Sequence, residues 1–238
     1  MKKLNISIGI LSWGALNTLF NTLKSYQRNG LLDIVQETTV FFQETTRQDT
    51  DMAEYFNVKY IESPDNVGIG KAFSILAENA ISDNILFLEN DWVLIEEKEK
   101  VYDELSKGLY LLENDVNVVK YRHRKTPGDP LYTRQYEGRE MDLPTHLGDC
   151  LHWKNNPDVD FPSYIKRDSR TGFFIIPSSN CCFTNNPTMY KTKFYTDTIS
   201  SFAGTGIALE GNIQNWWEQQ PFFLGHGDGL FKHYRIDR

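Results

Sequence analysis

This sequence lacks a long apolar segment. Its most apolar stretches, such as ILFLENDWVLI at 85–95, contain polar residues, whereas a membrane-spanning helix needs about 20 consecutive apolar residues. The N-terminus has the charged-then-apolar order of a secretory signal, but Asn5, Ser7 and Ser12 interrupt it and no cleavage site of small residues follows. We therefore expect a soluble, cytoplasmic protein without a transmembrane segment.

Cysteine and positive charge are also scarce. The three cysteines are Cys150, Cys181 and Cys182, and an odd number with two adjacent does not form a disulfide framework, which fits a reducing compartment. The 25 Lys and Arg residues face 32 Asp and Glu residues, so the net charge is −7. A chain of this charge repels phosphate backbones and anionic lipid, and we expect no nucleic-acid partner.

The sequence does contain enough apolar residues for a full core, since 40% of its 238 residues are hydrophobic. It has no internal repeat, low-complexity tract or break in composition, so we expect one domain. Short apolar runs alternate with longer mixed segments in the first half, which predicts an α/β fold with a mostly parallel central sheet flanked by helices. The expected strands are 5–13, 38–44, 58–63 and 85–89, and the expected helices are 16–27 and 71–80, with a loop over 45–51.

The second half is less regular. It predicts helices over 97–112 and 209–220 and strands over 117–123 and 172–177. Between them lies a stretch rich in proline and glycine, which is more typical of a substrate-covering region than of a packed core.

Polar residues end several predicted strands, and in an open parallel sheet ligands collect at the carboxyl ends of strands. The four ends are Ser12-Trp13, Gln43-Glu44, Asp65-Asn66 and Glu89-Asn90-Asp91. Glu89 and Asp91 are two residues apart, so in extended chain their side chains leave on the same side and could bind one divalent cation, or one cation together with a ribose diol. The alternative is a solvated acidic turn after a strand.

The segment DNVGIGKAF at 65–73, followed by the strand that ends in Glu-Asn-Asp, resembles the GT-A glycosyltransferases, particularly the inverting, family-2-like enzymes. Their usual pattern is N-x-G-x-x-x-A, a helix, and a strand that ends in a DxD-type triplet. The first predicted strand and helix resemble those of the family as well. Within the family, the chain resembles the small soluble members from bacteria or large DNA viruses. The resemblance implies a nucleotide-sugar-binding half at 1–115 and an acceptor-binding half at 116–238.

The resemblance also implies roles for individual residues on the donor side. Ser12 and Trp13 would contact the nucleotide base, and Glu44 the base or ribose. Asp91 would ligate the metal directly. Glu89 would face the ribose or a metal-bound water, and it belongs with Asp91 and His233 to the residues that would hold the metal. The remaining donor-binding positions by this similarity are Asp65, Asn66, Gly68, Lys71 and Asn90.

Two candidates lie near the C-terminus. Glu210 is the acid that opens a helix where these enzymes keep their catalytic base, although a helix dipole alone favours an acid there by roughly 0.3–1 kcal/mol. Histidines from this end often reach the cation in metal-dependent relatives, so His233 is the first choice and His226 the second, against the alternative of a surface or satisfied histidine. A nitrogen ligand beside carboxylates favours Mn²⁺ over Mg²⁺.

A basic cluster stands out in this acidic chain and could contact a diphosphate or an anionic acceptor; the alternative is a solvated strand edge protected by cations. Its members are Lys120, Arg122, Arg124, Lys125, Arg134 and Arg139.

The chain departs from the family in having Glu-Asn-Asp for the triplet and in lacking the QxxRW signature. The missing signature argues against a processive synthase.

The resemblance implies a metal-dependent, inverting glycosyltransferase that moves a sugar from a nucleotide-diphosphate donor, a UDP-sugar, to a glycan, protein or small-molecule hydroxyl, and inversion in particular is implied by the resemblance alone. Two alternatives remain open. One is a sugar-1-phosphate nucleotidyltransferase, although the expected Gly-rich basic loop after the first strand reads SWGALNT here. The other is a noncatalytic module that binds a nucleotide or sugar.

Overall fold

The computed structural model of this chain describes residues 2–128, 144–185, 187–204 and 209–237. Its described strands form one sheet in the order β3-β2-β1-β4-β9-β6-β10-β8-β7, with β5 paired to β10. The strands are β1 (Leu4–Trp13), β2 (Val35–Gln43), β3 (Lys59–Ser63), β4 (Asn84–Glu89), β5 (Trp92–Leu94), β6 (Val118–Arg122), β7 (Lys166–Arg167), β8 (Phe174–Pro177), β9 (Thr188–Lys191) and β10 (Phe223–His233). β5, β8 and β9 run against the others, so the prediction of a mostly parallel α/β sheet is confirmed.

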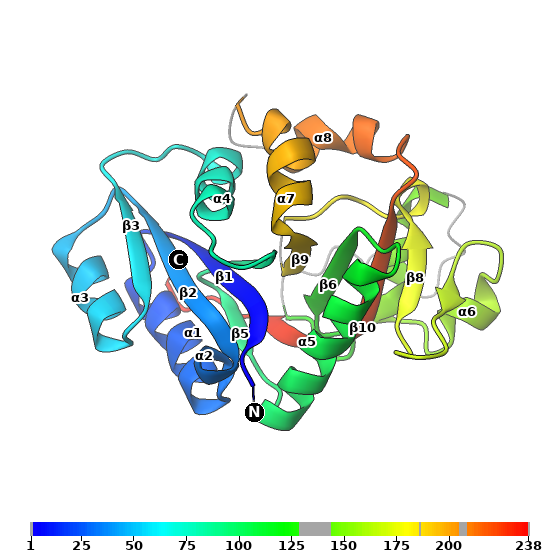
Figure 1. The fold of residues 1–238 in the computed structure, drawn as a ribbon, viewed down its shortest axis with the longest axis horizontal. Coiled ribbons are helices and arrows are strands. Elements are labelled where there is room, and N and C mark those ends of the chain that lie inside the picture. Colours follow the sequence, from blue (N-terminus) through cyan, green and yellow to red (C-terminus); the bar gives the residue numbers. More distant parts are fainter. Residues whose placement is uncertain (1, 129–143, 186, 205–208, 238) are drawn as a thin grey trace.

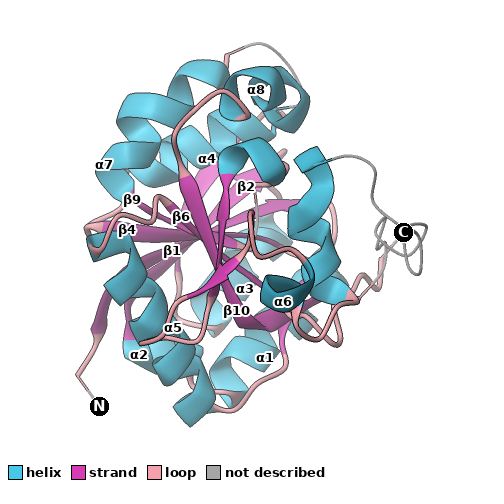
Figure 2. Ribbon diagram, turned by 90° about the vertical axis from the view of Figure 1, so that its right-hand side faces the viewer, coloured by secondary structure: helices cyan, strands magenta, loops and turns pink. Residues whose placement is uncertain are grey.

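Helices cover both faces of the sheet (Figure 1). The helices are α1 (Leu16–Arg28), α2 (Leu31–Ile34), α3 (Arg47–Tyr55), α4 (Ile69–Glu78), α5 (Lys98–Glu113), α6 (Pro157–Asp160), α7 (Thr192–Phe194) and α8 (Leu209–Trp217). α1, α2, α3 and α5 lie on one side and α4, α7 and α8 on the other, and Figure 2 shows the strands between these two layers. Among the described residues, no helix combines the length and apolar character that crossing a membrane requires.

Two hydrophobic cores fill the space between the layers, one on each face. On β1, Ile6, Ile8 and Ile10 are fully buried toward the core that α1 and α5 cover. On β4, Leu86 and Leu88 join that core, whereas Ile85 and Phe87 join the core beneath α4 and α8. Burial on both faces explains the continuous apolar run of β4, which an alternating, half-exposed strand would not show.

The sequence prediction was wrong at α3. The polar segment at 45–51 was expected to be a loop, but a helix begins at Arg47. Thr46 caps it, because its hydroxyl accepts a hydrogen bond from the backbone N–H of Asp49 (3.4 Å) while the Asp49 carboxylate accepts one from the N–H of Thr46 (2.9 Å). This reciprocal capping box has Asp in place of the usual Glu or Gln at its fourth position.

The glycine-rich segment near the C-terminus forms a strand. Gly225, Gly227 and Gly229 lie in the long strand β10, although a segment so rich in glycine is not typical of a strand. At Gly227, a Cβ atom would lie 2.4 Å from the Glu104 carboxylate, so α5 can pack against this strand only where the side chain is missing. Gly229 has a φ of 82°, in the left-handed region, at the irregularity in the pairing between β10 and β6. The glycines therefore allow close packing and a bulge.

The irregular region after β6 contains a 3₁₀ segment at Pro144–His152 and the short helix α6. Residues 129–143, which include Arg134 and Arg139 of the predicted basic cluster, lie outside the described residues. The predicted boundary between a donor half and an acceptor half at residue 115 remains a prediction, while the sheet itself runs continuously through both.

Candidate active site

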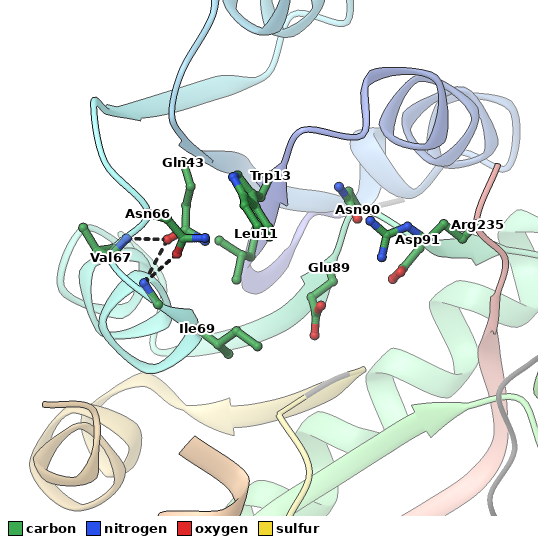
Figure 3. Close-up of a pocket in the computed structure, with 11 residues that line it drawn as sticks. Leu11, Trp13, Gln43, Asn66, Val67, Ile69, Glu89, Asn90, Asp91 and Arg235 are labelled. Carbon is green, nitrogen blue, oxygen red and sulfur yellow. Dashed lines mark hydrogen bonds between the residues drawn. The ribbon is translucent and has the colours of Figure 1, made fainter. Parts of the chain in front are cut away.

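A cavity of about 570 Å³ lies at the carboxyl ends of β1, β2 and β4 (Figure 3). β1 pairs with β2 on one side and β4 on the other, so the cavity occupies the point where the order of parallel strands reverses. Open α/β sheets bind ligands at such switch points. The cavity is lined by Leu11, Trp13, Gln43, Asn66, Val67, Gly68, Ile69, Glu89, Asn90, Asp91 and Arg235.

Trp13 is the last residue of β1 and leaves 52% of its surface exposed, an unusual state for a large aromatic side chain. Its indole N–H donates a hydrogen bond to the Glu44 carboxylate at 2.9 Å. Glu44 follows the end of β2 with a φ of 50°, and it does not line the cavity. The structure therefore brings these two predicted residues together as a pair in which Glu44 orients Trp13, whose ring can stack on a planar group.

Gln43 is a cavity residue that the sequence reasoning passed over in favour of Glu44. It is buried, and its Oε1 accepts hydrogen bonds from the backbone N–H groups of Val67 (2.8 Å) and Gly68 (3.1 Å). The Asn66 Oδ1 accepts a further bond from Gly68 at 3.0 Å (Figure 3). Both side-chain oxygens face N–H donors, so both amides have a fixed orientation.

The same contacts leave two amino groups at the cavity wall. Neither the Gln43 Nε2 nor the Asn66 Nδ2 makes a hydrogen bond within the part of the chain that the structure describes. These groups are available as donors to a ligand that carries carbonyl oxygens. Gly68, with a φ of 81°, precedes α4 and allows the backbone conformation that presents its N–H to both side chains.

Asp65 and Lys71 flank this loop but do not line the cavity. The Asp65 backbone is held by the Ser63 hydroxyl, which donates to the Asp65 carbonyl at 2.7 Å, and the Asp65 side chain is exposed. Lys71 is exposed on the first turns of α4. Their roles in donor binding remain predictions.

The acidic triplet lies in the tight turn between β4 and β5. Asn90 is buried, its side-chain amide donates to the Ser12 hydroxyl at 3.3 Å, and its carbonyl accepts a hydrogen bond from the Thr22 hydroxyl at 2.6 Å. These bonds attach the turn to β1 and α1. Ser12 thus supports the triplet from within the sheet and does not line the cavity, whereas Glu89 and Asp91 both do.

His233, at the end of β10, lies beside Asp91. Its Nε2 is 3.1 Å from the Asp91 Oδ2, and its ring packs edge-on against Trp92 at 5.1 Å between centroids. The antiparallel pairing of β10 with β5 sets His233 opposite Trp92 and so carries the C-terminal segment to the triplet. The first-choice histidine of the sequence prediction is therefore adjacent to the predicted metal-ligating carboxylate.

The donor set of this pair fits a divalent cation. Two ligands that each lie about 2.1 Å from a cation at a right angle are about 3.0 Å apart, close to the observed separation of 3.1 Å. One carboxylate oxygen and one imidazole nitrogen suit Mn²⁺. Within the described ranges no cluster of three or more His, Cys, Asp or Glu residues could hold a metal alone. The remaining ligands would have to come from a bound anion and water.

Glu210 lies apart from the cavity. It opens α8, and its Oε1 accepts a hydrogen bond from the backbone N–H of Asn185 at 2.9 Å. Desolvation raises the pKa of its carboxyl, although the Asn185 bond and the charge of Lys120 oppose the shift. The structure therefore does not join Glu210 to the residues around Asp91.

His226, the second-choice metal ligand, is buried within β10 and does not line the cavity. Its Nε2 lies 2.8 Å from the Arg122 carbonyl oxygen and donates to it, and burial lowers the pKa of the imidazole well below its usual value. This arrangement matches the alternative of a satisfied core histidine.

The described members of the basic cluster bond to the protein's own groups. Lys120 donates to the Cys182 carbonyl (2.8 Å), Arg122 to the Gly128 carbonyl (3.0 Å) and Arg124 to the Leu151 carbonyl (2.7 Å). Lys125 donates to the Asn155 side chain at 2.7 Å. β6 lies between β9 and β10, so the alternative of edge protection is wrong. The cluster organises the segments around β6 and none of these four residues lines the cavity.

Arg235 lines the cavity and was missed by the sequence reasoning, which stopped at His233. It is an exposed residue two positions beyond the end of β10. No sequence motif predicts a role for Arg235, because its position beside Asp91 depends on the path of the chain after β10 (Figure 3).

No family model matches the sequence, and no curated protein matches it either. Similar solved structures do exist. One is residues 1–349 of TarS from S. aureus, 13% identical with a TM-score of 0.61, covering 98% of this chain and 60% of that one. The same TarS fragment in complex with UDP-GlcNAc is 12% identical with a TM-score of 0.58, covering 100% and 60%.

Another is glucosyl-3-phosphoglycerate synthase from Mycobacterium tuberculosis, in complex with Mn²⁺, UDP and glucosyl-3-phosphoglycerate. It is 14% identical with a TM-score of 0.51, covering 98% of this chain and 72% of that one. This chain thus spans about three fifths of the length of the TarS fragment. At these identities the similarity shows the fold, and the predicted GT-A fold is confirmed.

Proposed function

We propose that this GT-A chain is a glycosyltransferase that takes a UDP-sugar and moves the sugar to an acceptor hydroxyl. One observation carries the proposal. A single cavity combines an exposed tryptophan, two oriented amide donors and the Asp91 carboxylate, and His233 lies against that carboxylate from outside the cavity lining. These are the parts needed for a base, a carbonyl-rich edge and a metal-bound diphosphate. The TarS and glucosyl-3-phosphoglycerate synthase structures, which hold UDP-GlcNAc and UDP with Mn²⁺, support it.

The two amide groups favour uracil as the base. Gln43 and Asn66 present N–H donors at the wall beside Trp13. Uracil offers two carbonyl oxygens as acceptors, whereas cytosine places an amino donor where uracil has its second carbonyl. Stacking on Trp13 would hold any base, so the amides supply the discrimination.

On the phosphate side, Asp91 and His233 would hold a Mn²⁺ or Mg²⁺ ion. When bound, the ion offsets the charge that develops on the departing diphosphate. Glu89 lines the cavity beside this pair and is placed to accept a hydrogen bond from a hydroxyl of the ribose or the sugar. Thr22 and Ser12, through Asn90, keep the turn that carries both acids in place.

Glu210 is our candidate for the catalytic base of an inverting, direct displacement. In that reaction the acceptor oxygen bonds to the anomeric carbon as the bond from that carbon to the diphosphate breaks, and the carboxylate takes the acceptor proton. A raised pKa makes Glu210 a stronger base than an ordinary carboxylate. The role requires the acceptor to reach from the donor cavity to the start of α8.

Thermal unfolding with UDP, CDP, GDP and ADP, each with Mn²⁺ or with EDTA, tests the proposal. A ligand at 100 times its Kd stabilises the folded state by about 2.7 kcal/mol. We expect a rise in Tm with UDP that requires Mn²⁺, absent in Asp91→Asn and retained in Asp51→Asn, which changes an exposed acid on α3. No rise with any diphosphate would contradict the donor site. A rise with UTP, together with pyrophosphate release from UTP and a sugar 1-phosphate, would favour a nucleotidyltransferase.

A further inference from the structure

The chain continues past β10 as a short tail, residues 234–237, that crosses from the acidic triplet to α1. At one end the Tyr234 N–H donates to the Asp91 carbonyl at 2.7 Å. At the other end the N–H groups of Ile236 and Asp237 both donate to the Thr18 hydroxyl at 3.0 Å. The tail is therefore attached at two points, with Arg235 between them.

The second attachment completes the N-terminus of α1. The residue before this helix is Ala15, which has no side-chain oxygen to accept the free N–H groups of the first turn. Asp237 supplies one, because its Oδ2 accepts from the Thr18 N–H at 2.9 Å and its Oδ1 from the Asn17 side chain at 2.9 Å. Together with the bonds to the Thr18 hydroxyl, this is the reciprocal pattern of a capping box, formed by residues 219 positions apart.

The charge of Asp237 suits this place. A carboxylate is favoured at the positive end of a helix dipole, and hydrogen bonds from the Asn17 side chain and the Thr18 backbone lower the pKa of Asp237. The carboxylate therefore stays ionised near neutral pH, and the attachment is in place wherever the donor would bind.

Arg235 is the only cationic side chain among the described residues that line the cavity. Its Nε donates to the Asp237 carbonyl at 2.9 Å. Within the described ranges its two terminal nitrogens have no hydrogen bond or ion pair, and they extend toward Asp91 at the edge of the cavity (Figure 3). A guanidinium with free terminal N–H groups can bind phosphate oxygens in a bidentate manner.

We propose that Arg235 binds the diphosphate of the donor and that Asp237 is the positioning residue that holds it there, by fixing the tail on α1. This proposal rests on the proposed donor site. The capping bonds order the tail before the donor arrives, so less conformational entropy is lost on binding. The diphosphate would then contact the Arg235 guanidinium, which the C-terminal tail holds beside the acidic triplet.

Calorimetric titration of the full chain with UDP and with uridine, both in Mn²⁺, tests this. We expect Arg235→Ala to weaken UDP binding about tenfold or more, as for a lost hydrogen bond to a charged group, and to leave uridine binding unchanged. Arg235→Lys should recover part of the loss. Arg28→Ala, at the far end of α1, is the matched control and should change neither affinity.

The positioning role has its own test. Asp237→Ala should weaken UDP binding about three- to tenfold, and the double variant Arg235→Ala with Asp237→Ala should be no weaker than Arg235→Ala alone, because the two residues act on one contact. Thr18→Ser keeps the hydroxyl and should bind UDP normally, while Thr18→Val should resemble Asp237→Ala. Tm values of each variant without ligand confirm that the chain is folded.

The outcomes separate the two proposals. UDP binding to the wild-type chain that Arg235→Ala leaves unchanged, or an equal loss for uridine, would overturn the role of Arg235 while the donor site stands. Losses that add in the double variant would overturn the positioning role of Asp237. A wild-type chain that binds no UDP would overturn the proposed function itself and this inference with it.

Discussion

The Nε2 of His233 lies 3.1 Å from the Oδ2 of Asp91, although one residue ends the last strand and the other follows β4 in the first half of the chain. The pairing of β10 with β5 sets this contact, and the Tyr234 bond to the Asp91 carbonyl reinforces it. A long-range contact of this kind fixes an imidazole nitrogen and a carboxylate oxygen at a spacing that would suit a cation.

Removal of either member of the pair should abolish Mn²⁺ binding in the presence of UDP. Asp91→Asn keeps the volume but loses the charge, and His233→Phe keeps a flat ring to pack against Trp92 but loses the nitrogen. We expect both to lose the calorimetric signal that the wild type gives when Mn²⁺ is titrated into the chain mixed with excess UDP, after subtraction of the same titration without protein. Asp51→Asn should titrate like the wild type. Normal Mn²⁺ affinity in both pair variants would rule out the pair as the metal site.

Gln43→Glu should lower UDP affinity about tenfold, the cost of about 1–3 kcal/mol for a lost hydrogen bond in a desolvated site. The carboxylate still accepts the Val67 and Gly68 N–H groups, but it replaces the donor that faces the cavity with an acceptor. Stability should change little. Gln48→Glu, exposed on α3, is the control. The readout is the Kd for UDP and for uridine, and an unchanged Kd for both would place the base elsewhere.

Glu104, on α5, makes stability depend on pH. Burial and the nearby Asp228 raise its pKa from 4.5 to about 7, while Lys107, Lys100 and the Gly229 N–H oppose the shift. The folded state then holds a proton that the unfolded chain releases near pH 4.5. Its contribution is full below pH 4.5 and is lost as pH rises through 7, a change of about 3 kcal/mol.

Glu104→Gln, which stays neutral, should therefore be more stable than the wild type at pH 8 and show a smaller fall in the free energy of unfolding between pH 5 and 8. Urea unfolding at several pH values measures this, with Glu99→Gln on the exposed side of α5 as the control. The same pH slope in Glu104→Gln and the wild type would contradict the assignment.

Glu37 should act in the opposite direction. Burial alone would raise the pKa of its carboxyl, but hydrogen bonds from Lys59 (2.8 Å), the Ser7 hydroxyl (2.6 Å) and the Ile81 N–H (2.8 Å) lower it. Its contribution is present above its unfolded pKa and is lost as pH falls through the folded value. Glu37→Gln should cost about 1–3 kcal/mol at pH 7 and less at pH 3. Glu62→Gln, exposed on β3, is the control, and equal losses at both pH values would contradict the account.

The sequence predicted the strands of the first half well, because buried parallel strands such as β4 are continuous apolar runs. It failed at α3, where a polar amphipathic turn is stabilised by its capping box and not by apolar periodicity. Nor does the sequence reveal the role of the β10 glycines, which depends on what packs against them, such as Glu104 against Gly227. Local sequence patterns do not predict contacts between residues that are far apart in the chain.

The candidate site was predictable to a similar extent. The triplet and Trp13 end their strands, so strand ends marked them, and the family resemblance pointed to His233. Glu44 was chosen over Gln43 because acids are the usual residues there, but the left-handed φ of Glu44 turns it toward Trp13 and leaves Gln43 facing the cavity. Arg235 depends on a tail path set by contacts with Thr18, which no spacing in the sequence reveals.

The most direct test of the central claim is donor turnover. The chain is incubated in Mn²⁺ with UDP-GlcNAc, UDP-glucose, UDP-galactose and UDP-glucuronic acid, each with a pool of mono- and disaccharide acceptors, and released UDP and the anomeric configuration of the product are followed by NMR. We predict UDP release from one donor with inversion, reduced at least a hundredfold in Asp91→Asn and Glu210→Gln. Suppose instead that the chain binds UDP but releases no UDP from any donor above the background of Asp91→Asn. That result would contradict a glycosyltransferase and would indicate a noncatalytic binding module.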